Sequence, residues 1–364
     1  MKLELAALDL HFLIGEFQEL IGGKVEQIYL KGKEELVLSL HLPNVGKRIL
    51  RILIGKLAYL ARQKGEMPER PASFCVYLRK YLKNARIREI RQLGFERIME
   101  ISLETKTQRY NLIAELFSKG NVVLCDDSYN IFSTLDVQHW KDRTIKAKSV
   151  YDYPKKSFNF LKISQDELDE MCSSSEKESI VKTLAIDLGL GGEYSEEICR
   201  RAGIDKSRPA KDLSADDRRS LFSTIASIRE GQPFPCVIGD RFASINVSDA
   251  CVKKGSLNET LDELYTEESH EADKALLKKE TEGRISKVQK MIDEQKQKIK
   301  GLEVSAKDNQ RKGELIFENY QEIKDLLSRV KEAVKKHGWE AVKISGRIKA
   351  VDPKTGDMTI EVGD

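Results

Sequence analysis

A run of basic side chains between residues 79 and 91 is the first feature of this sequence that could do chemistry. Six cations stand against one acid, Glu89, in a chain whose formal net charge is only +3. Clustered cations on an otherwise balanced protein typically bind phosphate groups. The segment therefore predicts a phosphate-binding face, although a solvated helix face would give the same pattern. The six cations are Arg79, Lys80, Lys83, Arg86, Arg88 and Arg91.

A glycine hairpin offers a second way to hold phosphate. Gly189 and Gly191 flank Leu190 between two stretches of helical character, which is a helix-hairpin-helix pattern. Glycine lets a backbone approach a phosphate closely and present its N–H groups. No Lys or Arg flanks the hairpin directly. A phosphate clamp and a plain tight turn between packed helices are therefore equally good interpretations.

The sequence shows no familiar catalytic or metal-binding pattern. Its six cysteines include no C-x-x-C pair, its five histidines are scattered, and it has no P-loop or Ser/His/Asp arrangement. We therefore predict no enzymatic activity, no metal and no cofactor. Thiols of this kind are typical of a reduced, cytoplasmic protein. Glu4 and Asp9 interrupt the apolar N-terminus and argue against a signal peptide, and no apolar run is long enough to cross a membrane.

The elements that must position these groups fall into two predicted domains. Residues 1–155 combine amphipathic helices at 8–21 and 72–82 with alternating strand-like runs, which predicts an antiparallel α+β domain. Residues 160–235 are helical and form the predicted helix-hairpin-helix domain, which a linker at 236–256 follows. The strand-like runs are 24–30, 35–42, 47–54, 85–90, 96–104, 109–117, 121–127 and 130–136.

Residues 257–337 carry a heptad pattern whose 3-4 spacing does not slip between 285 and 334. This spacing predicts a coiled-coil arm, and its apolar stripe requires a covering partner or self-association. Small and polar seam residues at 305–313 predict a break or bend in the arm. Residues 338–364 predict a β-hairpin-like tip. We expect the chain to be a fragment, with a returning coil helix beyond Asp364.

Several sequence blocks together carry a resemblance to a known family. They are LDLHFLIGEF at 8–17 with GGKVEQIY at 22–29, PASFCVYLRKYL at 71–82 with ERI at 96–98, ELFSKGNVVLCD at 115–126, and KGELI at 312–316. With the helix-hairpin-helix pattern, they resemble the NFACT family, which includes NEMF, RqcH and the fibronectin-binding protein A group. The resemblance covers essentially the whole chain in the right order.

The NFACT resemblance implies a ribosome-associated quality-control factor. Such a factor binds a large ribosomal subunit that carries an obstructed peptidyl-tRNA, and it contacts the rRNA of that subunit. It also recruits tRNA for template-free tailing of the stalled chain. The resemblance further implies a glycosylase-like N-terminal domain, helix-hairpin-helix elements and a coiled-coil arm on the subunit. The C-terminal RNA-binding domain that normally follows in the family is not seen in this sequence.

The resemblance also implies roles for individual residues. In the family, an acidic residue early in the first helix and an Asp-Arg pair support tRNA recruitment. Here Glu replaces the Asp of the pair, and the arginine can stack on an unpaired base or fork onto phosphate. The resemblance implies tRNA contacts at Asp9, Glu96 and Arg97. From their charge and position in the sequence, we add as predicted tRNA contacts Arg79, Lys80, Lys83 and Lys119, with Gly189 and Gly191 as the phosphate-clamp hairpin.

Structural interpretations compete with these roles. Asp9 could be a helix N-cap, which contributes about 1 kcal/mol. Glu96 and Arg97 could be neighbours on one strand that face opposite sides, with Arg97 in a surface salt bridge.

Two other functions remain as alternatives. A DNA-repair glycosylase would explain the glycosylase-like domain, but those enzymes use a proline after the initiator methionine as their amine nucleophile. Lys2 occupies that position here and disfavours this chemistry. A surface adhesin, the function for which part of the family was first named, is disfavoured because no export signal is seen.

Overall fold

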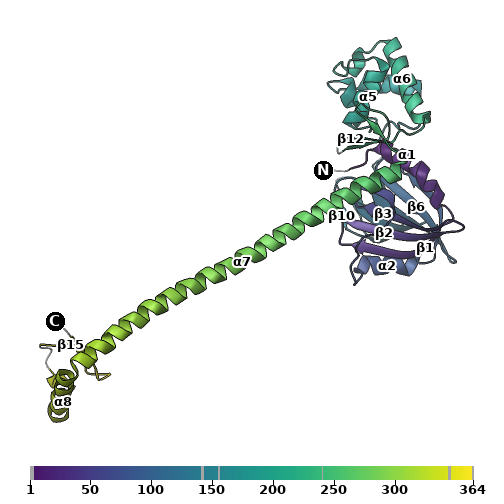
Figure 1. Cartoon of the computed structure of the whole chain (residues 1–364). Coiled ribbons are helices and arrows are strands. Elements are labelled where there is room, and N and C mark those ends of the chain that lie inside the picture. The colour runs from purple at the N-terminus through teal and green to yellow at the C-terminus, as the bar shows by residue number, and fades with distance from the viewer. Residues whose placement is uncertain (1–3, 141–142, 155, 240, 343–345, 363–364) are drawn as a thin grey trace. The chain divides into compact units, whose positions relative to one another are not determined.

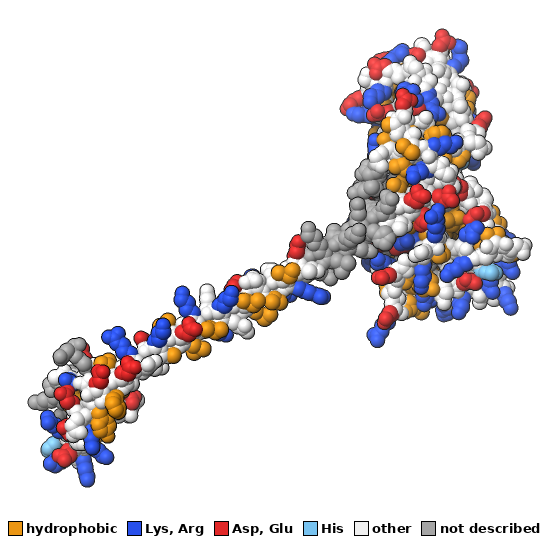
Figure 2. All heavy atoms as spheres, in the orientation of Figure 1, with side chains coloured by type: hydrophobic (Ala, Val, Ile, Leu, Met, Phe, Trp, Pro, Cys, Tyr) orange, Lys and Arg blue, Asp and Glu red, His pale blue; other side chains and the backbone are white. Residues whose placement is uncertain are grey.

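The structure is a computed structural model of the chain (Figure 1, Figure 2). It describes residues 4–140, 143–154, 156–239, 241–342 and 346–362, without the side chains of 267–280 and 341. The chain divides into two units, Met1–Glu271 and Ala272–Asp364. Both predicted domains and the start of the predicted arm therefore belong to the first unit.

An antiparallel sheet of nine strands dominates the first unit, in the order β4-β3-β2-β1-β5-β6-β7-β8-β9 (Figure 1). The predicted α+β class is confirmed, because helices accompany this antiparallel sheet. Several strands are buried on both faces and not on one face alone, as in Glu35–Leu42, where seven of eight residues are buried. The elements are α1 (Ala7–Phe17), β1 (Lys24–Lys31), β2 (Glu35–Leu42), β3 (Gly46–Leu53), β4 (Leu57–Ala61), α2 (Ser73–Leu82), β5 (Arg86–Gln92), β6 (Ile98–Glu104), β7 (Arg109–Glu115), β8 (Asn121–Asp126) and β9 (Ile131–Thr134).

The sheet consists of two halves, β4-β3-β2-β1 and β5-β6-β7-β8-β9, which meet at β1 and β5. Strands β1 and β5 share a single registered pair, Lys24 with Arg86. The halves also meet where Gly55 N, in the turn between β3 and β4, donates to Glu115 O at the end of β7, at 3.2 Å. A Cβ on Gly120 would lie 2.1 Å from Gly55 N, and both glycines have positive φ. Only glycine permits this backbone contact, so these two turns hold the halves together.

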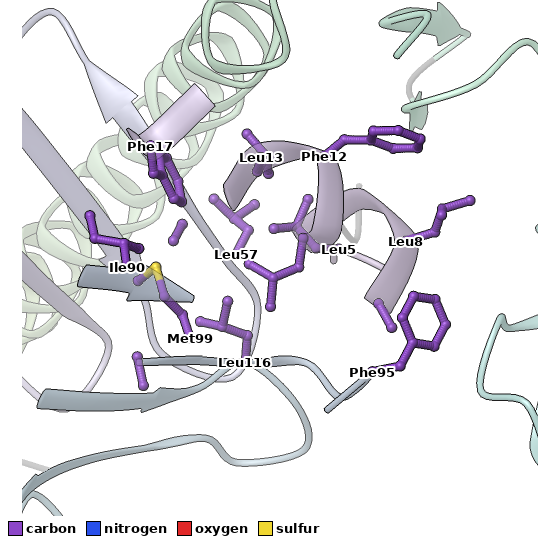
Figure 3. Close-up of a cluster of buried hydrophobic side chains, with 14 of the residues drawn as sticks. Leu5, Leu8, Phe12, Leu13, Phe17, Leu57, Ile90, Phe95, Met99 and Leu116 are labelled. Atoms are coloured by element: carbon purple, nitrogen blue, oxygen red, sulfur yellow. The ribbon is translucent and has the colours of Figure 1, made fainter. Parts of the chain in front are cut away.

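Helix α1 packs over this join. Its Leu13 and Phe17 belong to one buried cluster with Leu57 of β4, Ile90 of β5 and Met99 of β6 (Figure 3). A side chain of this kind contributes about 1.5–3 kcal/mol when fully buried. The helix therefore ties both halves of the sheet into one core.

The rest of the first unit contains the predicted helix-hairpin-helix and a small sheet. Helices α4 and α5 flank the glycine hairpin, which confirms that prediction. The predicted linker contains three short strands, in the order β13-β12-β14. The elements are β10 (Gln138–His139), β11 (Thr144–Ile145), α3 (Gln165–Ser174), α4 (Ile180–Ile186), α5 (Gly192–Ala202), α6 (Ala215–Glu230), β12 (Cys236–Ile238), β13 (Arg241–Ala243) and β14 (Val252–Lys253).

Helix α7 (Leu257–Glu318) begins inside the first unit. The carboxylate of Glu16 accepts from Leu257 N at 2.7 Å and from Asn258 N at 3.0 Å, which satisfies N–H groups that a helix start leaves free. Asn258 Oδ1 in turn accepts from Leu60 N of the edge strand β4 at 2.7 Å. The start of the helix is thus bound to the core of the first unit.

The second unit holds most of α7, followed by α8 (Tyr320–His337) and a hairpin of β15 (Ile348–Asp352) and β16 (Asp357–Ile360). The hairpin confirms the predicted tip. The predicted break at 305–313 is wrong, because α7 continues to Glu318 and the interruption lies at Asn319. Small and polar seam residues weaken packing between helices, whereas one glycine within a helix costs only about 1 kcal/mol.

The arm is helical, but the coiled coil stays a prediction. Where side chains are described, from 281 to 318, the apolar seam is exposed, with Leu302 reaching 70% (Figure 2). Among the described helices, none has the length and apolar composition of a membrane span.

Replacing Glu16 with alanine should destabilise the first unit, because the start of α7 loses its hydrogen-bond acceptor. We expect the free energy of unfolding to fall by about 1–3 kcal/mol in urea denaturation. Glu19→Ala is the matched control, since Glu19 is exposed and pairs with Arg48, and it should change stability by less than about 0.5 kcal/mol. Equal effects of the two variants would contradict this account.

Candidate nucleic-acid interface

A cleft of about 590 Å³ in the first unit brings together residues that are far apart in the sequence. Its walls come from the start of α1, the turn between β5 and β6, the segment before α3 and the glycine hairpin. Four predicted site residues line it: Glu96, Arg97, Gly189 and Gly191. The Glu96–Arg97 pair and the glycine hairpin therefore belong to one site.

Glu96 and Arg97 lie in the turn between β5 and β6, where Leu93 N donates to Ile98 O at 3.0 Å. They line the same cleft, so the interpretation as strand neighbours on opposite sides is wrong. The predicted strand run began two residues too early, since β6 starts at Ile98.

The Arg97 guanidinium is held near the mouth of the cleft. Its Nη1 donates to Leu5 O at 3.3 Å and lies 3.6 Å from Glu4 Oε2. The side chain of Arg97 is 32% exposed, which leaves part of its donor fork open to a ligand.

Lys156 completes the cationic lining, although no sequence pattern predicts its role. Its Nζ lies 3.4 Å from Glu96 Oε1. Burial raises the pKa of Glu96 above its usual range, and the neighbouring charges of Lys156 and Arg97 oppose that rise. Lys156 reaches the site from a segment about 60 residues away from Glu96, so no local spacing signals it.

Gly189 allows Lys156 to approach the hairpin backbone. Gly189 has φ +80°, and a Cβ there would lie 2.1 Å from Lys156 Nζ. The basic group that the hairpin lacks in sequence is thus supplied from elsewhere in the fold. A clamp of this kind combines a point charge with an accessible backbone, which suits phosphate.

Asp9 is buried, with 3% of its surface exposed, behind the wall that α1 contributes. Its Oδ2 accepts from Ala6 N at 2.8 Å, and its Oδ1 accepts from the Tyr194 hydroxyl of α5. The interpretation of Asp9 as the N-cap is wrong, because Ala6 is the N-cap and Asp9 is the third helical residue. Its carboxylate is therefore a structural link between α1 and α5 in this structure, and a direct RNA contact by Asp9 stays a prediction.

Tyr194 extends this link to the small sheet. Ser244 N donates to the Tyr194 hydroxyl oxygen at 2.9 Å, and the Ser244 Oγ lies 3.1 Å from the same atom. Burial raises the pKa of Asp9 to about 6 and that of Tyr194 well above its usual value. Three segments of the chain thus converge on one buried hydrogen-bond network.

The basic run from 79 to 91 does not form one free phosphate-binding face. Arg79 Nε donates to Ile28 O at 2.7 Å, Arg88 pairs with Glu104, and Arg91 lies 2.8 Å from Glu100. The strand pattern brings acids of β6 opposite the basic residues of β5. Lys80 and Lys83 are exposed but do not line the cleft, whereas Lys119 is exposed in the turn after Phe117, which does.

The arrangement can bind and orient a polyanion. Two cations, two carboxylates and a glycine backbone face one cleft, so it could recognise phosphate together with hydrogen-bond donors on bases. Lys2, on which the glycosylase alternative depends, lies outside the described residues.

The model of the NFACT N-terminal and middle domains matches residues 7–356. The chain is 30% identical to the archaeal Rqc2 homolog aRqcH of Methanocaldococcus jannaschii, covering 100% of this chain and 58% of that protein. It is 22% identical to the ribosome quality control complex subunit NEMF of Mus musculus, covering 92% of this chain and 35% of that protein.

A solved structure supports the same relationship. It is the N-terminal part of the fibronectin/fibrinogen-binding protein from Streptococcus suis, with 25% identity and a TM-score of 0.61. The similarity covers 72% of this chain and 100% of that one. The curated relatives are longer, since the chain spans 58% or less of the two named above.

Asp9 should give stability a distinct pH dependence. Its pKa is about 6 in the folded protein against an ordinary 3.8, so folding favours the protonated carboxyl. The stability that this group contributes is complete below about pH 4 and is lost as the pH rises through about 6. Asp9→Asn cannot titrate there. The stability of the wild type relative to the variant should therefore fall by roughly 2–3 kcal/mol over this window.

Urea denaturation at a series of pH values measures this difference. Other carboxylates titrate in both proteins and cancel in the comparison. Parallel pH profiles would show that the buried network does not control the protonation of Asp9.

Gly189→Ala should release Lys156 from the hairpin, whereas Gly191→Ala should not. Both glycines have positive φ, so both variants share a cost of about 1 kcal/mol, but only the Gly189 Cβ would meet the ammonium. Amine-selective labelling read by mass spectrometry should show faster reaction of Lys156 in Gly189→Ala alone. Equal labelling in the two variants would argue against the contact.

Proposed function

Because the chain belongs to the NFACT family, we propose that it acts in ribosome-associated quality control and that its cleft binds tRNA. The observation that carries the proposal is the convergence of Arg97, Lys156 and the glycine hairpin in one cleft. Each group suits a different part of RNA: the guanidinium suits bases or phosphates, and the ammonium and backbone suit phosphates.

The partner of the whole protein is the large ribosomal subunit that carries an obstructed peptidyl-tRNA. Support comes from the mouse relative, which is named as a ribosome quality control complex subunit. The first unit would hold tRNA, and the arm would contact the subunit and its rRNA. Such a protein would act in the cytoplasm, where ribosomes work.

The protein would act as a scaffold for template-free tailing of the stalled chain. Peptide bond formation would belong to the ribosome, while this protein would bring tRNA to it. Positioning alone can support such a reaction, because it removes the entropic cost of bringing two reactants together.

The direct test is binding of tRNA and of large subunits with peptidyl-tRNA to the purified chain. We expect co-sedimentation with these subunits, and weaker association with subunits that lack peptidyl-tRNA. Equal retention by both kinds of subunit, or none by either, would contradict the proposal.

Arg97→Ala should weaken tRNA binding by on the order of tenfold, because the cleft loses charge-assisted hydrogen bonds. The fold should survive, since a partly exposed arginine contributes little to stability. Arg219→Ala is the matched control, because Arg219 is an exposed arginine of α6 that pairs with Asp216. Unchanged tRNA affinity in folded Arg97→Ala would remove the cleft from the proposal.

A further inference from the structure

An exposed tryptophan directly follows strand β10, which pairs with β11. Trp140 is 44% exposed, and the nearby Val137 is 61% exposed. Strands β10 and β11 are paired, with Gln138 opposite Ile145, and Trp140 N donates to Arg143 O at 2.8 Å. Leaving a large aromatic ring in water sacrifices apolar burial, so a fixed and exposed indole calls for an explanation.

The indole is tied to the cleft wall by a chain of hydrogen bonds. Trp140 Nε1 donates to Gln138 Oε1 at 3.3 Å, and Gln138 Nε2 donates to Gly120 O at 2.8 Å. Gly120 N donates to Phe117 O at 2.8 Å, and Phe117 lines the cleft. The position of the ring is thus set by the same turn that carries Lys119.

A buried ion pair fixes the other strand of the hairpin. Arg143 Nη1 lies 2.7 Å from Glu115 Oε1 and donates to Asp152 O at 3.1 Å. The Tyr151 hydroxyl also donates to Glu115 Oε1, at 2.9 Å. The Arg143 guanidinium lies 5.9 Å from the centre of the Phe117 ring. Since Phe117 lines the cleft, both Gln138 and Arg143 connect the hairpin to the segment that forms the cleft wall.

The charge around the hairpin is suited to nucleic acid. Lys119 is exposed in the turn after Phe117, and Lys146 and Lys148 are exposed in the segment that follows β11. An aromatic platform among cations is the arrangement that binds single-stranded nucleic acid, in which bases stack on rings and lysines face phosphates. A purely apolar protein partner would not require these cations.

We infer that Trp140 stacks on an unpaired base of the RNA whose backbone the cleft holds. This inference rests on the proposed function, because the cleft must bind RNA for the base to reach the ring. It assigns to the hairpin the recognition of an unpaired nucleotide beside the bound segment. A duplex would present no free base face there.

The chain contains two tryptophans, so Trp339→Phe leaves Trp140 as the single fluorophore. The probe is a short unpaired oligoribonucleotide, compared with the same strand annealed to its complement. Stacking should quench the Trp140 emission with the single strand and leave it nearly unchanged with the duplex. Absence of quenching at saturating single strand would overturn the inference.

Affinity measurements provide a second test of the inference. Trp140→Ala should weaken single-strand binding by on the order of tenfold, and Trp140→Phe by less, because phenylalanine keeps a ring. Val137→Ala is the matched control, as an exposed apolar residue of the same hairpin, and should leave affinity unchanged. Equal loss in Trp140→Ala and Val137→Ala would show a general effect on the hairpin and overturn the inference.

Arg97→Ala separates the two proposals. If it weakens binding while Trp140→Ala does not, the stacking contact fails and the proposed function stands. If neither variant changes RNA affinity, the proposed function fails as well. If Trp140→Ala reduces retention on ribosomes without changing RNA affinity, the hairpin binds a protein and the inference is overturned.

Discussion

The buried hydrogen bond between Asp9 and Tyr194 is the contact on which the cleft depends. Asp9 belongs to α1, whose preceding residues form one wall, and Tyr194 belongs to α5, which follows the glycine hairpin of the other wall. Ser244 joins the same network from the small sheet. A buried carboxyl costs free energy unless it is hydrogen-bonded, so separation of the two walls would leave polar groups without partners.

This constraint explains how ordinary side chains acquire a shared role. Arg97 and Glu96 come from a tight turn of the sheet, and Lys156 comes from the segment that leads to the helical domain. None of them is unusual alone. They face each other because the core under α1 and the hydrogen-bond network of Asp9 hold the sheet and the helical domain at a fixed separation. The start of α7 is bound to the same core through Glu16.

Much of the fold could be predicted because apolar residues recur along the sequence with the period of each element. The leucines at every second position of β2 and the apolar face of α2 with Phe74, Leu78 and Leu82 are local signals of this kind. Strand β4 was not predicted, because it has only five residues and its sequence, LAYLA, does not alternate apolar and polar side chains. The arm helix was predicted, but its interruption was predicted at 305–313 and lies at Asn319. Small and polar seam residues weaken packing against another helix, but they do not by themselves end a helix.

The site was less predictable, because it depends on contacts between distant segments. The glycine hairpin and the Glu96–Arg97 pair were found, but not their proximity, and neither Lys156 nor Trp140 has a local signal. The measurement that tests the central claim most directly is photo-crosslinking of bound tRNA to the full chain, with the linked peptides identified by mass spectrometry. If the cleft binds tRNA, cross-links should appear at 93–97, 154–156 and 185–191. Cross-links confined to α2 or to the arm would show that tRNA binds elsewhere.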